Sequence, residues 1–438
     1  SQSHSVSLTR SMQYVYLNNV RGFTRALVPI KSCNFLVGEN STGKSSFLSL
    51  FRLLSRPELF LSTGISLADD GSPSAFSDLV SAWSTNRTYF DLGLLDFALS
   101  PDGKPRVQYW LYRFVEVEAS PVVHIFVQRR SSTETHLRFT KRSSEYRRNE
   151  LGTSLVTEQD AVDAFLAAGA ALGNPEEDFE RLPKYFSGFP PIGLALSVVS
   201  SILSNKGANK REFQLEMPTP RELTWIAPIR TRPQRIYDGL SRGYSAEGTH
   251  TPFVLKQHLK SKQFVEKLKE FGATSGLFEV VGTHTFGKGA RNPFEVLIQL
   301  KGEQFNIENV GYGVSQVMPL IVEFLARKEG RRFAVQQPEV HLHPRAQAAL
   351  GSLLFYLCRE RRQSFIVETH SDFMIDRYRL EMNGAEKTPD SQILFFDRCD
   401  TGNRISAIPI DSSGRYPIDQ PPAFRDFFVR EEMRMLSL

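Results

Sequence analysis

The clearest chemistry in this sequence lies in a short loop of glycine and small polar residues. Residues 38–45 read Gly-Glu-Asn-Ser-Thr-Gly-Lys-Ser and fit the phosphate-loop pattern at every position. In such a loop, backbone N–H groups and the amino end of the following helix surround the phosphates of a nucleotide. We therefore predict that this loop binds ATP and that the Ser45 hydroxyl enters the Mg²⁺ shell. The predicted phosphate-binding residues are Asn40, Ser41, Thr42, Gly43, Lys44, Ser45 and Ser46.

The segments around this loop have the strand, loop and helix order that the motif requires. An apolar strand is expected at residues 33–37 and a helix at 44–54, with two short strands upstream at 12–17 and 26–30. Near the other end of the chain, strands and helices alternate, which predicts a largely parallel sheet with helices on its faces. These expected elements are, in order, residues 332–336, 345–358, 364–368, 372–381 and 393–396.

The residues between these two regions follow a different pattern. Alternating strands are expected at 107–117, 122–128 and 137–140, followed by an alanine-rich helix at 161–172. Later segments predict a strand at 225–229, one basic amphipathic helix at 253–271 and three strands within 278–307. The sequence thus predicts an α/β chain in four parts. These are the first half of an ATPase head at 1–55, an insertion at 56–222, the second half at 223–410 and a tail helix at 411–438.

Composition narrows the class of protein. The three cysteines, Cys33, Cys358 and Cys399, lie far apart, which argues against a disulfide framework and a zinc ribbon. Residues 1–10 are polar and no apolar run is long enough to span a bilayer, so we expect a cytoplasmic protein without a membrane partner. The segment 129–148 is rich in Arg and Lys. It could follow a nucleic-acid backbone or form a solvated, strand-rich face with charged edges.

A second group of motifs lies in the carboxyl-terminal part of the chain. One apolar strand ends at Gln336-Gln337-Pro338-Glu339, directly before the turn His341-Leu-His343-Pro344. The next strand ends at Glu-Thr-His370-Ser. Upstream of both lies the segment 310–316, Val-Gly-Tyr-Gly-Val-Ser-Gln, which contains Gly313 and Ser315.

In this order the segments resemble the Walker B end, the histidine switch and the signature segment of ABC-type ATPases. The resemblance is to the RecF, SMC and OLD group, and within it to predicted bacterial ATPases of anti-phage defence operons. It covers roughly residues 10–55 and 223–400. It implies an ABC-ATPase-like split head with a mixed or parallel sheet and a large strand-plus-helix insertion.

The resemblance also implies partners and residue roles. Such heads form head-to-tail dimers, in which Gly313 and Ser315 would complete the nucleotide site of the neighbouring protomer and His370 would sense the γ-phosphate. Too few residues follow His370 for the nuclease domain that OLD proteins append, so an effector, a nuclease or a toxin, is expected as a separate chain. Two other functions stay open: a DNA-repair clamp like RecF, and an ATP-binding scaffold that sequesters an effector.

The sequence departs from this group at the Walker B position, where Asp and Glu are usual. Gln336 offers a neutral carbonyl oxygen to the metal shell, and Gln337 cannot accept a proton as a carboxylate does. Either Glu339 or His370 positions the attacking water, or ATP is bound tightly and hydrolysed slowly, or Gln337 is an engineered trap. We favour slow natural turnover. The candidate catalytic residues are therefore Gln337, Glu339 and His370, and the candidate Mg²⁺ residues are Ser45 and Gln336.

Two further groups have open roles. His341 and His343, with Glu339 and His370, could be drawn as a zinc site, but residues two apart at such a turn diverge, so a role in organising the turn is favoured. Arginines 230, 232 and 235 follow an expected strand. A role toward phosphate or a partner protomer and a plain surface role are both open for them.

Overall fold

The chain forms two compact units, which are described separately. The computed structural model describes residues 11–67, 74–100, 102–130, 132–151, 155–172, 178–205, 222–238, 240, 243–289 and 291–427. Unit 1 lies within Ser1–Ile30, Asn40–Arg221 and Phe396–Ile405, and unit 2 within Lys31–Glu39, Glu222–Phe395 and Ser406–Leu438. The expected division at residues 55, 222 and 410 differs from these units and stays a prediction of domain organisation.

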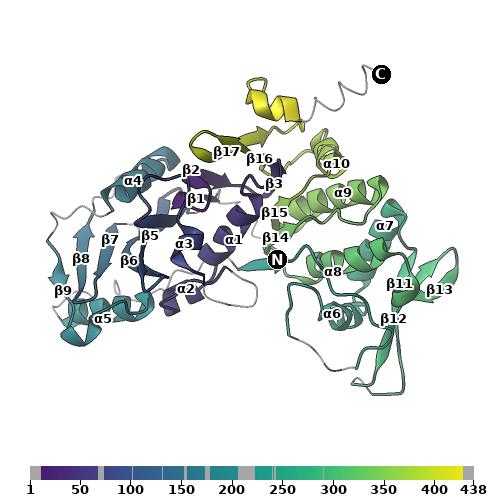
Figure 1. Ribbon diagram of the computed structural model, residues 1–438. Helices are drawn as coiled ribbons and strands as arrows, with labels where there is room; N and C mark the ends of the chain where they lie inside the picture. The colour runs from purple at the N-terminus through teal and green to yellow at the C-terminus, as the bar shows by residue number, and fades with distance from the viewer. Residues whose placement is uncertain are drawn as a thin grey trace. The chain divides into compact units, whose positions relative to one another are not determined.

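Unit 1 is built on an eight-stranded antiparallel sheet with the strand order β2-β1-β4-β5-β6-β7-β8-β9 (Figure 1). The two amino-terminal strands pair with the sheet of the predicted insertion, because β1 bonds β4 along most of its length. The strands are β1 Ser11–Val20, β2 Phe23–Ile30, β4 Tyr89–Leu99, β5 Pro105–Val117, β6 Ser120–Arg130, β7 Thr133–Phe139, β8 Ser144–Glu150 and β9 Glu180–Arg181. Its helices are α1 Lys44–Leu54, α2 Glu58–Leu61, α3 Phe76–Leu79, α4 Glu158–Ala171 and α5 Ile192–Asn205, with a 3₁₀ turn at Lys184–Phe186.

Aromatic side chains join α4 to this sheet. Phe165 on α4 is buried and meets the rings of Tyr16 and Tyr109 edge-on, with centroid distances of 5.8 and 5.3 Å. The strands expected at 107–117, 122–128 and 137–140 and the helix at 161–172 correspond to β5, β6, β7 and α4. Strand β8 was not expected, since its sequence is polar and charged and lacks the apolar alternation that predicts a half-buried strand.

The basic segment 129–148 runs from the end of β6 through β8. Arg129 is buried, and Arg138 donates to a Glu145 carboxylate oxygen through Nε at 2.9 Å and Nη2 at 2.5 Å. The Arg138 guanidinium also lies 4.0 Å from the centroid of the Phe179 ring. Some of the basic side chains are therefore paired or buried within the sheet. This favours a strand-rich face with charged edges over a surface that follows a nucleic-acid backbone.

Unit 2 is built on a sheet with the strand order β10-β14-β15-β3-β16-β17. Strands β10, β14, β15 and β3 are parallel neighbours, so a strand from the amino-terminal part of the sequence is paired with strands from the carboxyl-terminal part. This is the arrangement that a split α/β head requires. The strands are β3 Cys33–Gly38, β10 Leu223–Ile226, β14 Arg332–Gln336, β15 Ser364–Glu368, β16 Ser391–Cys399 and β17 Gly402–Ile410. A separate antiparallel sheet contains β11 Val280–Thr285, β12 Phe294–Leu300 and β13 Glu303–Asn306.

The helices of unit 2 depart from expectation at one place. The single helix predicted at 253–271 is wrong: α6 covers Thr251–His258 and α7 covers Lys262–Ser275. The break has a local cause, because the Ser261 side chain accepts a hydrogen bond from the Phe264 N–H and starts α7 as its N-cap. The strand expected at 225–229 ends at Ile226, before Pro228, which has no N–H to donate.

Three further helices complete unit 2. They are α8 Tyr312–Ala326, α9 Pro344–Glu360 and α10 Asp372–Met382, and α9 and α10 lie side by side (Figure 1). Residues 422–427 are helical, and residues 428–438 of the expected tail helix, like residues 1–10, lie outside the described residues. In the described part of the chain, no helix is long and apolar enough to cross a membrane.

Helix α8 packs on the sheet through aromatic rings. Phe324 on α8 meets Phe333 of β14 and Phe365 of β15 edge-on at 5.0 and 5.1 Å, and these two rings stack at 5.2 Å. All three side chains are buried. The aromatic contacts fix the helix that carries Gly313 and Ser315 against β14, which ends at Gln336, and β15, which ends two residues before His370.

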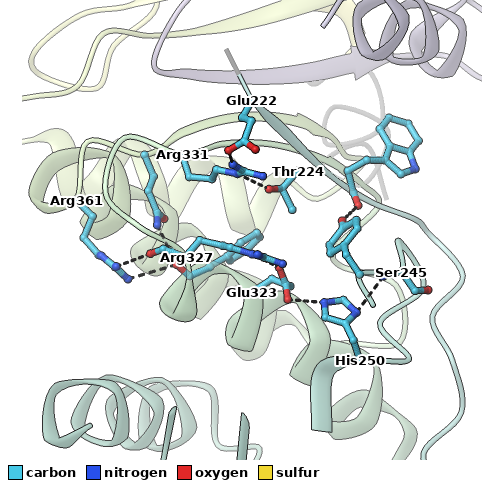
Figure 2. Close-up of polar contacts among 12 residues, drawn as sticks. Glu222, Thr224, Ser245, His250, Glu323, Arg327, Arg331 and Arg361 are labelled. Carbon is cyan, nitrogen blue, oxygen red and sulfur yellow. Dashed lines mark hydrogen bonds and ion pairs between the residues drawn. The ribbon is translucent and has the colours of Figure 1, made fainter. Parts of the chain in front are cut away.

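A buried polar network holds the carboxyl end of α8 (Figure 2). The Ser245 N–H donates to His250 Nδ1 at 3.2 Å, so the imidazole proton is on Nε2, which donates to Glu323 Oε1 at 2.7 Å. Arg327 Nε donates to the other oxygen of the same carboxylate at 2.7 Å. Arg361 donates to the Leu325 carbonyl at 2.7 Å and to the Arg327 carbonyl at 2.6 Å, which satisfies acceptors at the helix end.

We expect Glu323→Gln to destabilise unit 2 by about 1–3 kcal/mol at pH 7, because an amide group would turn a donor toward His250 or Arg327. Burial raises the pKa of the Glu323 carboxyl, but hydrogen bonds from His250 and Arg327 outweigh it and lower the pKa below its ordinary value. A lowered folded pKa contributes stability above the ordinary value of about 4.3 that is lost as pH falls below it. Urea unfolding should therefore give a higher free energy of unfolding for wild type than for the variant at pH 7, and this difference should decrease in acid. Equal stability at pH 7 would contradict this.

Candidate functional site

The phosphate loop opens α1 at the residue that the motif predicts. Gly43 is the N-cap of α1, and the Phe47 N–H donates to its carbonyl at 2.8 Å. Among the described residues, no side chain caps this first turn. Lys44 is only 4% exposed. An amino end without a side-chain cap, next to a buried lysine, is the arrangement that binds an anion.

The loop backbone depends on glycine and on neighbouring residues of unit 1. Gly43 has a φ of 99°, and a Cβ there would lie 2.8 Å from both the Phe23 ring and the Asn403 amide nitrogen. Arg398 donates to the Ser41 carbonyl at 2.5 Å. Arg398 and Asn403 lie on β16 and β17, and no local sequence pattern points to either residue, because both contacts are long-range.

In unit 2 the ends of two parallel strands bring Gln336 and Glu368 together. Gln336 of β14 and Glu368 of β15 are register partners, and Gln336 Nε2 donates to Glu368 Oε2 at 2.9 Å. The Gln337 N–H donates to the Glu368 carbonyl at 2.7 Å, and Gln337 has a φ of 43°, which is uncommon for a residue with a side chain. Glu368 is 4% exposed. Sequence reasoning missed Glu368, although its position two residues before His370 could have pointed to it.

Glu339 and His370 also meet in this unit. Glu339 Oε1 accepts a hydrogen bond from the His370 N–H at 2.7 Å. Burial raises the pKa of the Glu339 carboxyl, although this hydrogen bond and the charge of Arg230 act in the opposite direction. Its Oε2 is buried without a hydrogen-bond partner in the described part of the chain. A carboxyl group with a raised pKa and an available oxygen suits a general base better than the neutral Gln337 does.

Arg230 is buried next to the Gln336–Gln337 turn rather than exposed on the surface. It is 2% exposed and donates to the carbonyls of Gln316 and Gln336 at 3.3 Å and of Gln337 at 3.5 Å. Burial lowers the pKa of its guanidinium to about 10, against the favourable charge of Glu339, so it stays charged at neutral pH. Arg230 thus ties the end of β14 to α8. A surface role is wrong for Arg230, whereas Arg232 and Arg235 are exposed.

Gly313 and Ser315 lie in the first turn of α8. A Cβ on Gly313 would lie 2.9 Å from the His341 carbonyl oxygen, so this close approach requires glycine. Ser315 is buried, and its hydroxyl donates to the Tyr312 carbonyl of its own helix at 2.8 Å. Tyr312 is 44% exposed, and its ring meets that of His341 edge-on at 4.6 Å. The exposed start of this helix is therefore formed by Tyr312 rather than by Ser315.

The two histidines of the turn organise local structure. His343 is the N-cap of α9 and accepts a hydrogen bond from the Ala346 N–H at 3.4 Å, while His341 has a φ of 67°. No group of three or more His, Cys, Asp or Glu in the described ranges could hold a metal ion alone. The Glu368 carboxylate and the Gln336 amide oxygen are hard oxygen donors, the kind of ligand that Mg²⁺ prefers.

Comparison with solved structures finds SMC head domains at low similarity. An SMC head bound to the C-winged helix domain of ScpA shares 14% identity, with a TM-score of 0.44, over 91% of this chain and 98% of that chain. A head with an extended coiled coil, bound to the C-terminal domain of ScpA from Pyrococcus furiosus, shares 12%, with a TM-score of 0.41, over 97% and 100%. The head from Thermotoga maritima shares 11%, with a TM-score of 0.36, over 92% and 99%. These TM-scores are below 0.5, so family membership rests on sequence.

No curated protein matches the sequence significantly. Residues 33–376 match the family described as "AAA domain, putative AbiEii toxin, Type IV TA system". The matched region runs from β3, which leads into the phosphate loop, to α10, which follows the His370 strand, and it includes every candidate site residue. The match confirms the ATPase class recognised from these motifs: the chain belongs to this family of AAA-domain ATPases.

Proposed function

We propose that this protein is the ATP-binding and ATP-hydrolysing subunit of a bacterial anti-phage defence complex. ATP and Mg²⁺ bind at the phosphate loop and drive a head-to-tail dimer, which controls a separately encoded effector, a nuclease or a toxin. The family description, which names an abortive-infection toxin and a toxin–antitoxin system, supports the defence context. Turnover is slow, because the usual acidic pair is replaced by Gln336 and Gln337.

The observation that carries the proposal is the start of α1. A glycine N-cap in a left-handed conformation leaves the first turn without a side-chain cap, and the buried Lys44 follows directly. Together with Ser45, these groups supply the amides, the ammonium and the hydroxyl that a magnesium-bound triphosphate needs. An ordinary helix of a structural protein gains stability from a Ser, Thr, Asp or Asn cap, which this helix lacks.

Hydrolysis is assigned to Glu339 rather than to Gln337. Glu339 is a carboxylate with a raised pKa that holds the His370 backbone through one oxygen and presents the other for a water molecule. In this role Glu339 accepts the proton of the attacking water. The neutral Gln337 supports the turn through backbone contacts to Glu368 and Arg230. His370 lies two residues after the end of β15 and is assigned to sensing the γ-phosphate.

A dimer explains the exposed start of α8. Gly311 and Tyr312 are exposed at this helix end, and the segment from Gly311 to Ser315 would face the nucleotide of a partner protomer. Backbone N–H groups at an exposed amino end of a helix can bind the γ-phosphate from the far side. ATP would then favour the dimer because it binds the closed state better than the open one.

The dimer is tested by mass measurement with two variants. We expect Ser315→Arg to block ATP-dependent dimerisation while ATP binding by the monomer is retained. Because Ser315 is buried, Gly311→Arg is the matched variant, since a Cβ at Gly311 meets no atom within 4 Å. Static light scattering should give a doubled mass for wild type with ATP and a monomer mass with ADP. A wild-type mass that does not depend on nucleotide, or ATP-dependent dimers of Gly311→Arg, would contradict this mode of dimerisation.

A further inference from the structure

We infer that a pocket within unit 2 binds a small organic anion that has an apolar body. The pocket lies between the loop 231–237, the start of α6 and one side of α8, and its empty volume is about 510 Å³, the open mouth included. Small-molecule sites are commonly roughly 300–1,000 Å³ in volume and combine an apolar lining with a few polar groups. The inference does not depend on nucleotide binding.

Much of the lining is apolar. Its buried apolar side chains come from separate elements of unit 2, and they are Tyr237, Leu255 of α6, Val296 of β12, Ile307, and Met318 of α8. An apolar ring or chain that enters the pocket therefore leaves water and gains contacts with several elements at once. This favours a ligand with a hydrocarbon body over a fully hydrated ion such as free phosphate.

Two hydroxyl groups of the lining residues have no partner in the protein. Oγ1 of Thr231 and Oγ1 of Thr251 are buried and make no hydrogen bond within the described part of the chain. Thr251 as a whole is 3% exposed. A buried hydroxyl without a hydrogen bond costs free energy, and most such groups in proteins are satisfied. A ligand atom that accepts hydrogen bonds would satisfy these donors.

The charge of the lining favours an anion. Arg232, which is exposed, is the one charged residue among the described residues that line the pocket. Thr251 is also the first residue of α6, and the amino end of a helix carries a positive partial charge. Hydroxyl donors and positive charge complement a carboxylate better than a neutral or cationic group. The expected ligand is therefore a carboxylate with a short apolar chain or ring.

Hydrogen bonds hold the walls of the pocket in place. Tyr237 exchanges backbone hydrogen bonds with Phe294 at 2.8 and 2.9 Å, which ties the loop 231–237 to β12. His250, directly before α6, donates to Glu323 of α8 at 2.7 Å and so joins two other walls (Figure 2). Because these contacts are made within the protein itself, the pocket is formed before a ligand binds. A preformed pocket lowers the entropy cost of binding.

Displacement of a fluorescent probe tests the ligand class. The full chain, without nucleotide, is titrated with anilinonaphthalene sulfonate, an anionic aromatic probe, and the bound probe is then displaced. Hexanoate should displace it. Hexanamide lacks the charge and acetate lacks the apolar chain, so each should need a concentration at least about tenfold higher. If hexanoate does not displace the probe, or if hexanamide or acetate competes equally well, the inference is wrong.

Variants of Thr251 test the position of the site. Thr251→Val keeps the shape of the side chain without its hydroxyl and should weaken hexanoate binding by about tenfold or more, the effect of losing a hydrogen bond to a charged group. Thr251→Ser should bind as wild type does, and so should the matched control Thr274→Val, at an exposed position of α7. Urea unfolding should show no loss of stability in Thr251→Val, because its hydroxyl has no partner in the described part of the chain. Equal hexanoate affinities of Thr251→Val and wild type would overturn the inference.

Discussion

Replacing Glu339 by Gln is expected to lower the rate of ATP hydrolysis by about 10²–10⁴-fold, the usual contribution of a general base. The substitution keeps the size of the side chain and an acceptor for the His370 N–H, so ATP binding should remain. The carboxylate is the active form, and burial raises the pKa of Glu339 above its ordinary value. The wild-type rate should therefore fall in acid, with a midpoint above that of an ordinary glutamate.

The matched variant for this experiment is Gln337→Glu. If Glu339 is the base, an added carboxylate at Gln337 changes the rate little, and steady-state phosphate release from the two variants separates the two positions. A large increase in the hydrolysis rate of Gln337→Glu, together with activity in Glu339→Gln, would show that the attacking water is polarised at position 337. The pH dependence of the wild-type hydrolysis rate is a second test. If the rate does not begin to fall at a pH above the ordinary pKa of glutamate, Glu339 is not the base.

Replacing Lys44 by Ala is expected to weaken ATP binding by at least about tenfold. The ammonium makes a charge-assisted contact to the β- and γ-phosphates, and a loss of about 1.4 kcal/mol already gives that factor. Lys44 is buried, so water cannot replace its charge easily. Isothermal titration calorimetry with ATP and Mg²⁺ measures the effect directly.

A surface lysine gives the control for charge alone. Lys269 is exposed on α7, and alanine is the best helix former, so Lys269→Ala removes the same charge without a change at the loop. It should bind ATP as wild type does. Equal affinities for wild type and Lys44→Ala would remove the basis for the nucleotide site, whatever the result for hydrolysis.

Local patterns were sufficient for several elements of the fold. The helix at 44–54 and the strands at 332–336 and 364–368 have the predicted bounds, because each is a short apolar segment closed by residues that stop it. The parallel sheet followed from the alternation of strands and helices. The break between α6 and α7 was missed, since the apolar spacing continues through Ser261 and hides its capping contact.

The sequence by itself determined the phosphate-loop motif, the bounds of β14 and β15 and the family, since these depend on residue types at fixed spacing along the chain. Only the tertiary structure decided which strand lies beside which, and therefore that Gln336 faces Glu368 and that Arg230 is buried under the same turn. The raised pKa of Glu339 is likewise a result of burial. Register and burial arise from contacts between residues far apart in the sequence, and a local motif contains no information about such partners.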